Sequence, residues 1–146
     1  MATYLPTRRN QRSFDYVSDI TFFKGKFYGL GIHDVLMTFE LNFGADSKPR
    51  ISCVKCITKY PTVSVILPKP LYSSGKSPYM TKKYLVECCG RLLMVKRHIE
   101  FTDTTFVHPL DCDRTAAFEV FEADLSTKPG QWRCLTTLGG QVLFVG

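Results

Sequence analysis

Phe22-Phe23-Lys24-Gly25-Lys26-Phe27-Tyr28-Gly29-Leu30 joins two short apolar runs through a turn that contains glycine. Two later passages have the same form: Val86-Glu87-Cys88-Cys89-Gly90-Arg91-Leu92-Leu93-Met94-Val95 and Leu138-Gly139-Gly140-Gln141-Val142-Leu143-Phe144-Val145. Glycine reaches the positive φ that a two-residue hairpin turn requires, and the twist of such a turn matches the flanking strands. Lys24-Gly25 and Gly139-Gly140 therefore predict hairpins, and we expect a third around Gly90.

Further strand patterns follow the first two hairpins. In Met37–Phe43 apolar and polar residues alternate, which predicts a half-buried strand with Met37, Phe39, Leu41 and Phe43 on one face. Phe118–Leu125 fits a helix and a strand about equally well, because its apolar residues also recur at helical spacing. Ile51–Ile57 and Trp132–Thr137 are two more strand candidates, each preceded by residues typical of turns.

The resulting unit is a hairpin, a strand, a turn and a strand within roughly 50–65 residues, which is typical of a β-propeller blade. We predict an all-β fold, a partial kelch-like β-propeller of about two to two and a half four-stranded antiparallel blades. One sheet should lie within Ile20–Ile57 and one within Tyr84–Thr137. Five side chains should be buried: Phe39, Leu41, Val86, Leu93 and Phe121.

Composition and length are those of one globular domain. The 146 residues are 45% hydrophobic and 22% charged, with a formal net charge of +6. Tyr60–Pro68, the longest uncharged apolar stretch, is far shorter than the roughly 20 residues that span a bilayer. No signal peptide opens the sequence, so we expect the six cysteines to be reduced and the protein to be cytoplasmic or nuclear. We divide it into a polar basic tail, residues 1–13, and a domain, residues 14–146.

The basic residues are unevenly distributed. Lys48–Lys83 holds eight basic residues and no acidic one. Such a stretch is either a solvated surface or a contact for an acidic protein, a nucleic acid or an anionic membrane, and of these we do not expect a membrane. We rank nucleic-acid binding below protein binding.

The motifs of catalysis and of metal or cofactor binding do not stand out. Ser74–Ser77 resembles the end of a P-loop but sits among prolines, where no helix can follow. Cys53 and Cys56 have the spacing of half a zinc site, yet residues three apart in a strand point to opposite faces. We expect these cysteines to be small buried apolar residues. We expect His33, His98 and His108 to be turn or surface residues, and we expect no catalytic residue, no metal and no cofactor.

Several phrases of the sequence carry a family resemblance. They are Asp19–Leu30, Lys83–Val95, Phe118–Leu125, Trp132 and Leu138–Gly146. In this order they resemble the KIB-type β-propeller domain, a former domain of unknown function that is usual in plant F-box proteins, over roughly Phe14–Gly146. The resemblance implies that Phe118–Leu125 is a strand. It also implies a non-enzymatic recognition module like the substrate-binding part of a ubiquitin ligase.

The sequence departs from the family pattern in two respects. No leucine-rich F-box precedes Phe14, so we do not expect direct binding to a ligase adaptor. The blade count is below that of a closed propeller, which predicts open sheet edges and self-association. A truncated gene product without independent function is the alternative.

Residues 68–83, rich in proline and lysine, are expected to form the connection between the blades. Binding residues concentrate in loops held by a rigid scaffold, and lysines steer acidic partners. We therefore predict that a partner protein of unknown identity binds here. The predicted binding residues are Lys69, Tyr72, Lys76, Tyr79, Lys82 and Lys83.

Overall fold

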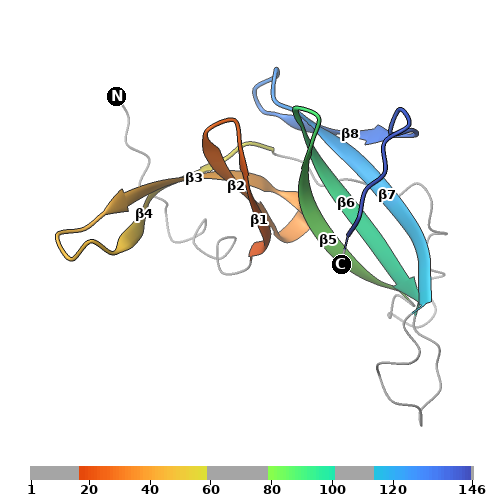
Figure 1. Cartoon of the computed structure of the whole chain (residues 1–146), viewed down its shortest axis with the longest axis horizontal. Coiled ribbons are helices and arrows are strands. Elements are labelled where there is room, and N and C mark those ends of the chain that lie inside the picture. Colours follow the sequence, from red (N-terminus) through yellow and green to blue (C-terminus); the bar gives the residue numbers. More distant parts are fainter. Residues whose placement is uncertain (1–16, 59–78, 101–113, 146) are drawn as a thin grey trace, which may run out of the picture. The chain divides into compact units, whose positions relative to one another are not determined.

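The computed structural model describes residues 17–58, 79–100 and 114–145, in which the chain forms two four-stranded antiparallel sheets (Figure 1). The first sheet lies in one compact unit and most of the second sheet lies in another. The first unit contains residues 17–58 together with Asp124–Trp132, and the second contains residues 79–123 and 133–145. The predicted all-β fold of blade-like sheets is confirmed.

The first sheet has the order β1-β2-β3-β4. Its strands are β1 (Val17–Phe23), β2 (Lys26–Gly31), β3 (Leu36–Phe43) and β4 (Pro49–Cys56), with a short 3-10 turn, η1 (Ile32–Asp34), before β3. Lys24 and Gly25 have φ values of 45° and 79°, so both turn residues are left-handed, as the hairpin prediction required. His33 lies in η1 with φ 57°, which confirms its expected place in a turn.

The second sheet has the order β5-β6-β7-β8. Its strands are β5 (Tyr79–Cys88), β6 (Arg91–Glu100), β7 (Arg114–Asp124) and β8 (Gln131–Leu135). The strand that the resemblance implied at Phe118–Leu125 is confirmed as part of β7. Pairing with β6 decides between helix and strand here, because Val120 lies opposite Val95 and Phe121 opposite Met94.

The core of the second unit lies along β6. Leu92, Leu93, Met94, Val95 and Ile99 are all buried. Because adjacent residues of a strand point to opposite faces, this run shows that β6 is covered on both sides. A continuous apolar run marks a central strand in this sheet.

The burial predictions were right for Leu93 and Phe121 and wrong for Leu41, which is 40% exposed, while Phe39 and Val86 are half-buried. The reason is the pairing of β3. Its last partner in β2 is Phe27, opposite Phe39, and beyond this point β3 pairs only with β4. A two-stranded ribbon has too little surface above it to bury the apolar side chains that alternation places on one face.

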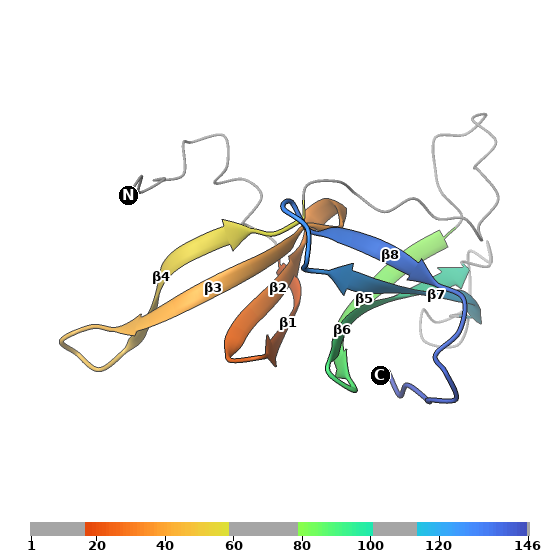
Figure 2. The same ribbon diagram turned by 90° about the horizontal axis from the view of Figure 1, so that it is seen from above.

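The hairpin predicted at Gly139-Gly140 forms only its turn. Gly139 and Gly140 both have positive φ, 64° and 81°. The expected strand Gln141–Val145 is wrong, since this segment has no strand structure and follows β8 as an irregular chain (Figure 2). A hairpin needs a sheet or a core beside it, and Val142 and Phe144 are both exposed in this segment.

Asp124–Trp132 belongs to the first unit although it follows β7 in sequence. The Gly130 amide donates to the Ile57 carbonyl at 2.8 Å, and Thr58 and Gly130 form a parallel bridge. The Trp132 indole Nε1 donates to the Asp34 carbonyl at 2.8 Å. Trp132 is half-buried and bonded to the turn before β3.

Candidate interaction surfaces

One face of the first sheet is apolar across all four strands. Cross-strand neighbours share a face, so the register assigns side chains to it directly. We call this the apolar face, and its members are Ile20, Phe22, Phe27, Met37, Phe39, Leu41, Phe43, Ile51 and Val54. The central row runs from Phe22 through Phe27 and Phe39 to Val54.

Aromatic contacts organise this face. The rings of Phe22 and Phe27 pack edge to face, with centroids 5.0 Å apart. The Phe39 ring lies over Gly29, so closely that a Cβ at Gly29 would be 2.5 Å from a ring carbon. Glycine at this position lets the aromatic ring cover the strand.

Burial falls steadily along β3. Met37 is fully buried, Leu41 is 40% exposed and Phe43 is 73% exposed. Ile20, Phe22, Phe27 and Ile51 are also exposed by more than a third. Contiguous exposed apolar surface of this kind marks a site of protein contact, because single exposed apolar residues are normal but a continuous set is not.

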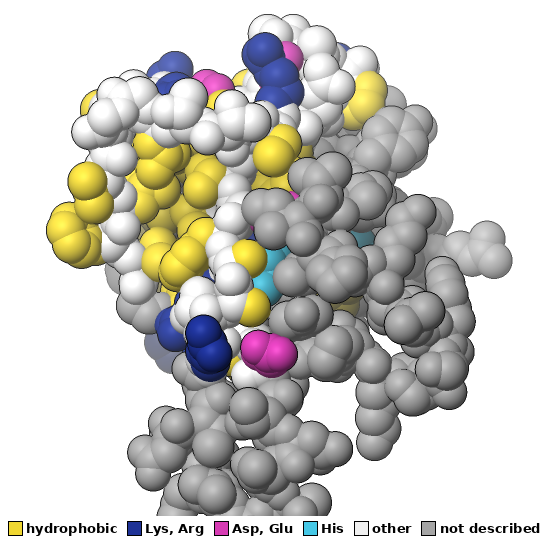
Figure 3. Space-filling view, turned by 90° about the vertical axis from the view of Figure 1, so that its right-hand side faces the viewer, with side chains coloured by type: hydrophobic (Ala, Val, Ile, Leu, Met, Phe, Trp, Pro, Cys, Tyr) yellow, Lys and Arg dark blue, Asp and Glu magenta, His cyan; other side chains and the backbone are white. Residues whose placement is uncertain are grey.

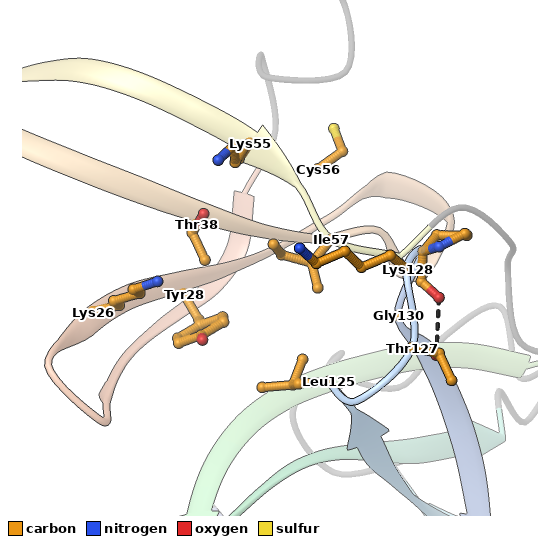
Figure 4. Close-up of a pocket in the computed structure, with 11 residues that line it drawn as sticks. Lys26, Tyr28, Thr38, Lys55, Cys56, Ile57, Leu125, Thr127, Lys128 and Gly130 are labelled. Carbon is orange, nitrogen blue, oxygen red and sulfur yellow. Dashed lines mark hydrogen bonds between the residues drawn. The ribbon is translucent and has the colours of Figure 1, made fainter. Parts of the chain in front are cut away.

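The opposite face of the first sheet carries a pocket of about 520 Å³. Lys26, Tyr28, Thr38 and Lys55 come from β2, β3 and β4, and they share this face by register. The segment from Leu125 to Gly130 supplies the other wall, including Lys128 (Figure 4). All of these residues belong to the first unit.

The wall formed by Leu125–Gly130 is held close to β4. A Cβ at Gly130 would lie 3.1 Å from the Asp124 carbonyl oxygen and from a methyl carbon of Ile57. The absence of a side chain at Gly130 therefore permits the approach that the Gly130–Ile57 hydrogen bond fixes. At the other end Ser126 donates to the Asp124 carboxylate through its amide and its hydroxyl, which orders the turn.

A buried polar cluster crosses the second sheet. His98 Nε2 lies 2.7 Å from Glu119 Oε2, and His98 Nδ1 lies 3.0 Å from the Thr81 hydroxyl. A neutral ring that donates from Nε2 accepts the Thr81 proton at Nδ1. His98 and Glu119 are both buried, so the expectation of a surface or turn position for His98 is wrong. Its pairing with Thr81 and Glu119 explains how an imidazole is accommodated inside the sheet.

Lys96 shares this face and is also buried. Its ammonium lies 5.3 Å from the centroid of the Phe121 ring, within the range of a cation–π contact. Hydroxyl, imidazole and carboxylate occur in the order used by nucleophilic enzymes. Of Thr81, His98 and Glu119, Glu119 also lines a pocket of the second unit, and its contact with His98, together with that of Thr81, holds the buried imidazole in place.

The turn between β5 and β6 holds two neighbouring thiols. Cys88 Sγ donates to the Gln141 Oε1 at 3.0 Å, and Gln141 Nε2 donates to Cys89 Sγ at 2.5 Å. Desolvation and the adjacent Cys89 raise the pKa of the Cys88 thiol. The five described cysteines are free, and only Cys88 is partly buried. The expectation of buried cysteines is therefore wrong.

Cys53 and Cys56 lie opposite Glu40 and Met37, which face opposite ways, as expected for residues three apart. Over residues 17–58, 79–100 and 114–145, no three histidine, cysteine or acidic side chains form a group that could hold a metal ion. No helix in the same part of the chain is long and apolar enough to cross a membrane.

A second pocket of about 420 Å³ lies in the second unit, between Phe118–Val120 and the segment Cys134–Gln141. Among the described residues of this unit, the large apolar side chains that are exposed are Phe118, Val142 and Phe144. Figure 3 shows hydrophobic side chains gathered on one face, with charged side chains towards its edges. The second unit thus also presents apolar surface.

The predicted binding residues are placed only in part. Lys69, Tyr72 and Lys76 lie outside the described residues, as do His108 and the P-loop-like Ser74–Ser77. Tyr79, Lys82 and Lys83 lie on β5, so the expected loop is wrong for residues 79–83. Lys82 pairs with Arg97 and Lys83 with Lys96, which puts the two lysines on opposite faces. They therefore do not form one surface, and their role in binding stays a prediction.

The sequence analysis did not predict the residues that line the pocket of the first unit. Lys55 belongs to the basic stretch Lys48–Lys83, which was a usable signal. Nothing in the sequence links it to Lys128, 73 positions later. Only the tertiary contact of Gly130 with Ile57 brings their segments together.

The comparisons with known proteins agree with this architecture. The family model described as KIB1-4 beta-propeller matches residues 3–146. No curated protein and no solved structure matches the chain. The four-stranded sheets and a match over nearly the whole length show that the chain belongs to the KIB1-4 β-propeller family.

Proposed function

We propose that this chain is a protein-interaction module that binds its partner on the apolar face of the first sheet. The single observation that carries the proposal is the exposure of that face across four hydrogen-bonded strands. Propeller-family domains suit this role, because a rigid sheet presents side chains in a fixed pattern. The partner would bring a complementary apolar surface.

Charge supports a partner with acidic residues around its contact. The chain has a net charge of +6, so an acidic surface is attracted over long range and the association rate rises. Affinity would come from the aromatic and aliphatic side chains of the apolar face, which become buried when the partner binds, with Phe22, Phe43 and Ile51 as anchors. This division between steering and affinity is usual at protein interfaces.

The finer proposal is substrate recognition for a ubiquitin ligase, and it rests on the family resemblance alone. In that role the partner is a protein whose ubiquitylation depends on the apolar face.

The test is affinity capture with quantitative mass spectrometry, using the full chain and two matched variants. Phe43→Ser with Ile51→Ser removes two strongly exposed members of the apolar face. Val142→Ser with Phe144→Ser removes apolar residues that are at least as exposed, from the second unit, and serves as the control. We expect specific proteins to be lost with the first variant and retained with the control.

A captured protein is then purified and its affinity for each form is measured by calorimetry. A loss of at least tenfold for Phe43→Ser with Ile51→Ser, against less than twofold for the control, supports the proposal. Equal binding by all three forms contradicts it. For the ligase role, ubiquitylation of the partner in cells should fall with the first variant only.

A further inference from the structure

The pocket on the opposite face of the first sheet has an unusual charge composition. Among the described residues that line it are Lys26, Lys55 and Lys128, and none of these described lining residues is an aspartate or a glutamate. Among the described residues none of these three ammonium groups takes part in an ion pair. Three like charges around one hollow repel one another, and a bound anion removes that repulsion.

We propose that this pocket binds a small phosphate monoester, with its phosphate group between the three lysines. A phosphate monoester carries a charge of about −1.5 to −2 at pH 7, more than a carboxylate offers. Three ammonium groups match this charge better than they match a single negative charge. The site lies away from the apolar face, so the proposal is independent of the protein-interaction role.

Hydroxyl groups on the floor of the pocket add hydrogen bonds. Tyr28 and Thr38 are cross-strand neighbours on the same face as Lys26 and Lys55. Burial raises the pKa of the Tyr28 phenol, so the hydroxyl keeps its proton at neutral pH and donates. Phosphate oxygens accept several such bonds at once.

The remaining lining gives room for the organic part of the ligand. The volume of about 520 Å³ is within the range of small-molecule sites and exceeds what a phosphate group alone would fill. Ile57, Leu125 and Pro129 supply apolar surface beside the lysines. Figure 4 shows the Lys128 side chain extended past Ile57, with Leu125 across from them. A ligand with a small ring or chain attached to its phosphate fits these surfaces.

The lysines come from separate elements whose positions are fixed by backbone hydrogen bonds. Lys26 lies on β2 and Lys55 on β4, two strands of one sheet that both pair with β3, and Lys128 lies between Ser126 and Gly130. The Gly130–Ile57 hydrogen bond sets the distance of the Lys128 wall from the sheet. The pocket therefore exists before a ligand binds, which lowers the entropy cost of binding.

The experiment is an NMR titration of the ¹⁵N-labelled full chain with phenyl phosphate, inorganic phosphate and phenylacetate in separate runs. We expect saturable shifts at the amides of Lys26, Lys55 and Lys128, with phenyl phosphate tightest and phenylacetate weakest. Shifts that do not saturate, or equal affinity for phenyl phosphate and phenylacetate, would overturn the proposal.

A matched pair of variants distinguishes binding in the pocket from general electrostatic attraction of the ligand to a basic protein. Lys26→Gln with Lys55→Gln removes two charges from the pocket, and Lys24→Gln with Lys48→Gln removes two from the same sheet outside it. The pocket variant should bind phenyl phosphate at least tenfold more weakly, and the control should stay within twofold of the original chain. An equal loss in both variants contradicts a pocket. Lys128→Gln alone should weaken binding severalfold, and amide spectra of all variants check that the sheets are intact.

Discussion

The Trp132 indole donates a 2.8 Å hydrogen bond to the backbone carbonyl of Asp34, a residue 98 positions earlier in the chain. It joins the segment after β7 to the turn before β3. The same segment bonds to Ile57 through Gly130, so two contacts hold it within the first unit. A late part of the sequence thereby completes an early sheet.

Replacing Trp132 by Phe removes this hydrogen bond but keeps an aromatic side chain. We expect the free energy of unfolding to fall by about 1 kcal/mol, the usual net value of one hydrogen bond. Circular dichroism during urea unfolding measures the change. Hydrogen exchange should become faster at the amides of Leu36 and Gly130, and unchanged exchange there would show that the contact does not hold the segment.

Removal of the Glu119 carboxylate should destabilise the second unit. In Glu119→Ala the buried His98 ring loses its partner, at a cost of about 1–3 kcal/mol or more. Glu119→Gln retains an oxygen that accepts from His98 Nε2, so its loss should be smaller. Denaturant unfolding of both variants checks the order, and equal losses would mean that cavity formation, not the hydrogen bond, dominates.

Gly29→Ala should be destabilising because the added Cβ meets the Phe39 ring. We expect a loss of about 1–3 kcal/mol, typical of overpacking. Phe39→Leu in the same chain gives the methyl group room, so the double variant should lose less than the sum of the single losses. Strict additivity in thermal or urea unfolding would contradict the contact.

The reactivity of Cys88 should rise at higher pH than that of an ordinary thiol. Its pKa is raised, so less thiolate is present at any given pH. Cys89→Ser removes one cause of the rise and should move the alkylation profile to lower pH. Arg91→Gln removes a charge that lowers the pKa and should move it to higher pH. Iodoacetamide labelling with peptide mass spectrometry follows Cys88 alone.

Self-association through the first sheet is expected in dilute solution, because the apolar face and the edge strands β1 and β4 offer contacts to a second copy. Sedimentation should show oligomers that shift towards monomer in Phe43→Lys with Ile51→Lys. Val142→Lys with Phe144→Lys is the control. If the unsubstituted chain stays monomeric when its concentration is raised from about 1 µM to about 100 µM, this prediction is wrong.

The strand order within each unit was accessible from the sequence because it depends on neighbours in the chain. The turns at Gly25 and Gly90 require left-handed residues, and alternation in β3 assigns Met37 and Phe39 to one face whatever lies elsewhere. These are local rules of backbone geometry. The family phrases resolved the one segment, Phe118–Leu125, where apolar spacing alone did not.

The burial of particular side chains and the composition of the pocket were decided by tertiary contacts. Leu41 has the same local pattern as Met37, yet β2 ends before reaching it and only Met37 is covered. The local sequence around His98 does not predict its burial, which depends on the hydrogen-bond partners Thr81 and Glu119 from the two neighbouring strands. Lys55 and Lys128 line one pocket because the Gly130 amide donates a hydrogen bond to the Ile57 carbonyl. Local sequence determines which way a side chain points, and long-range pairing determines what it meets there.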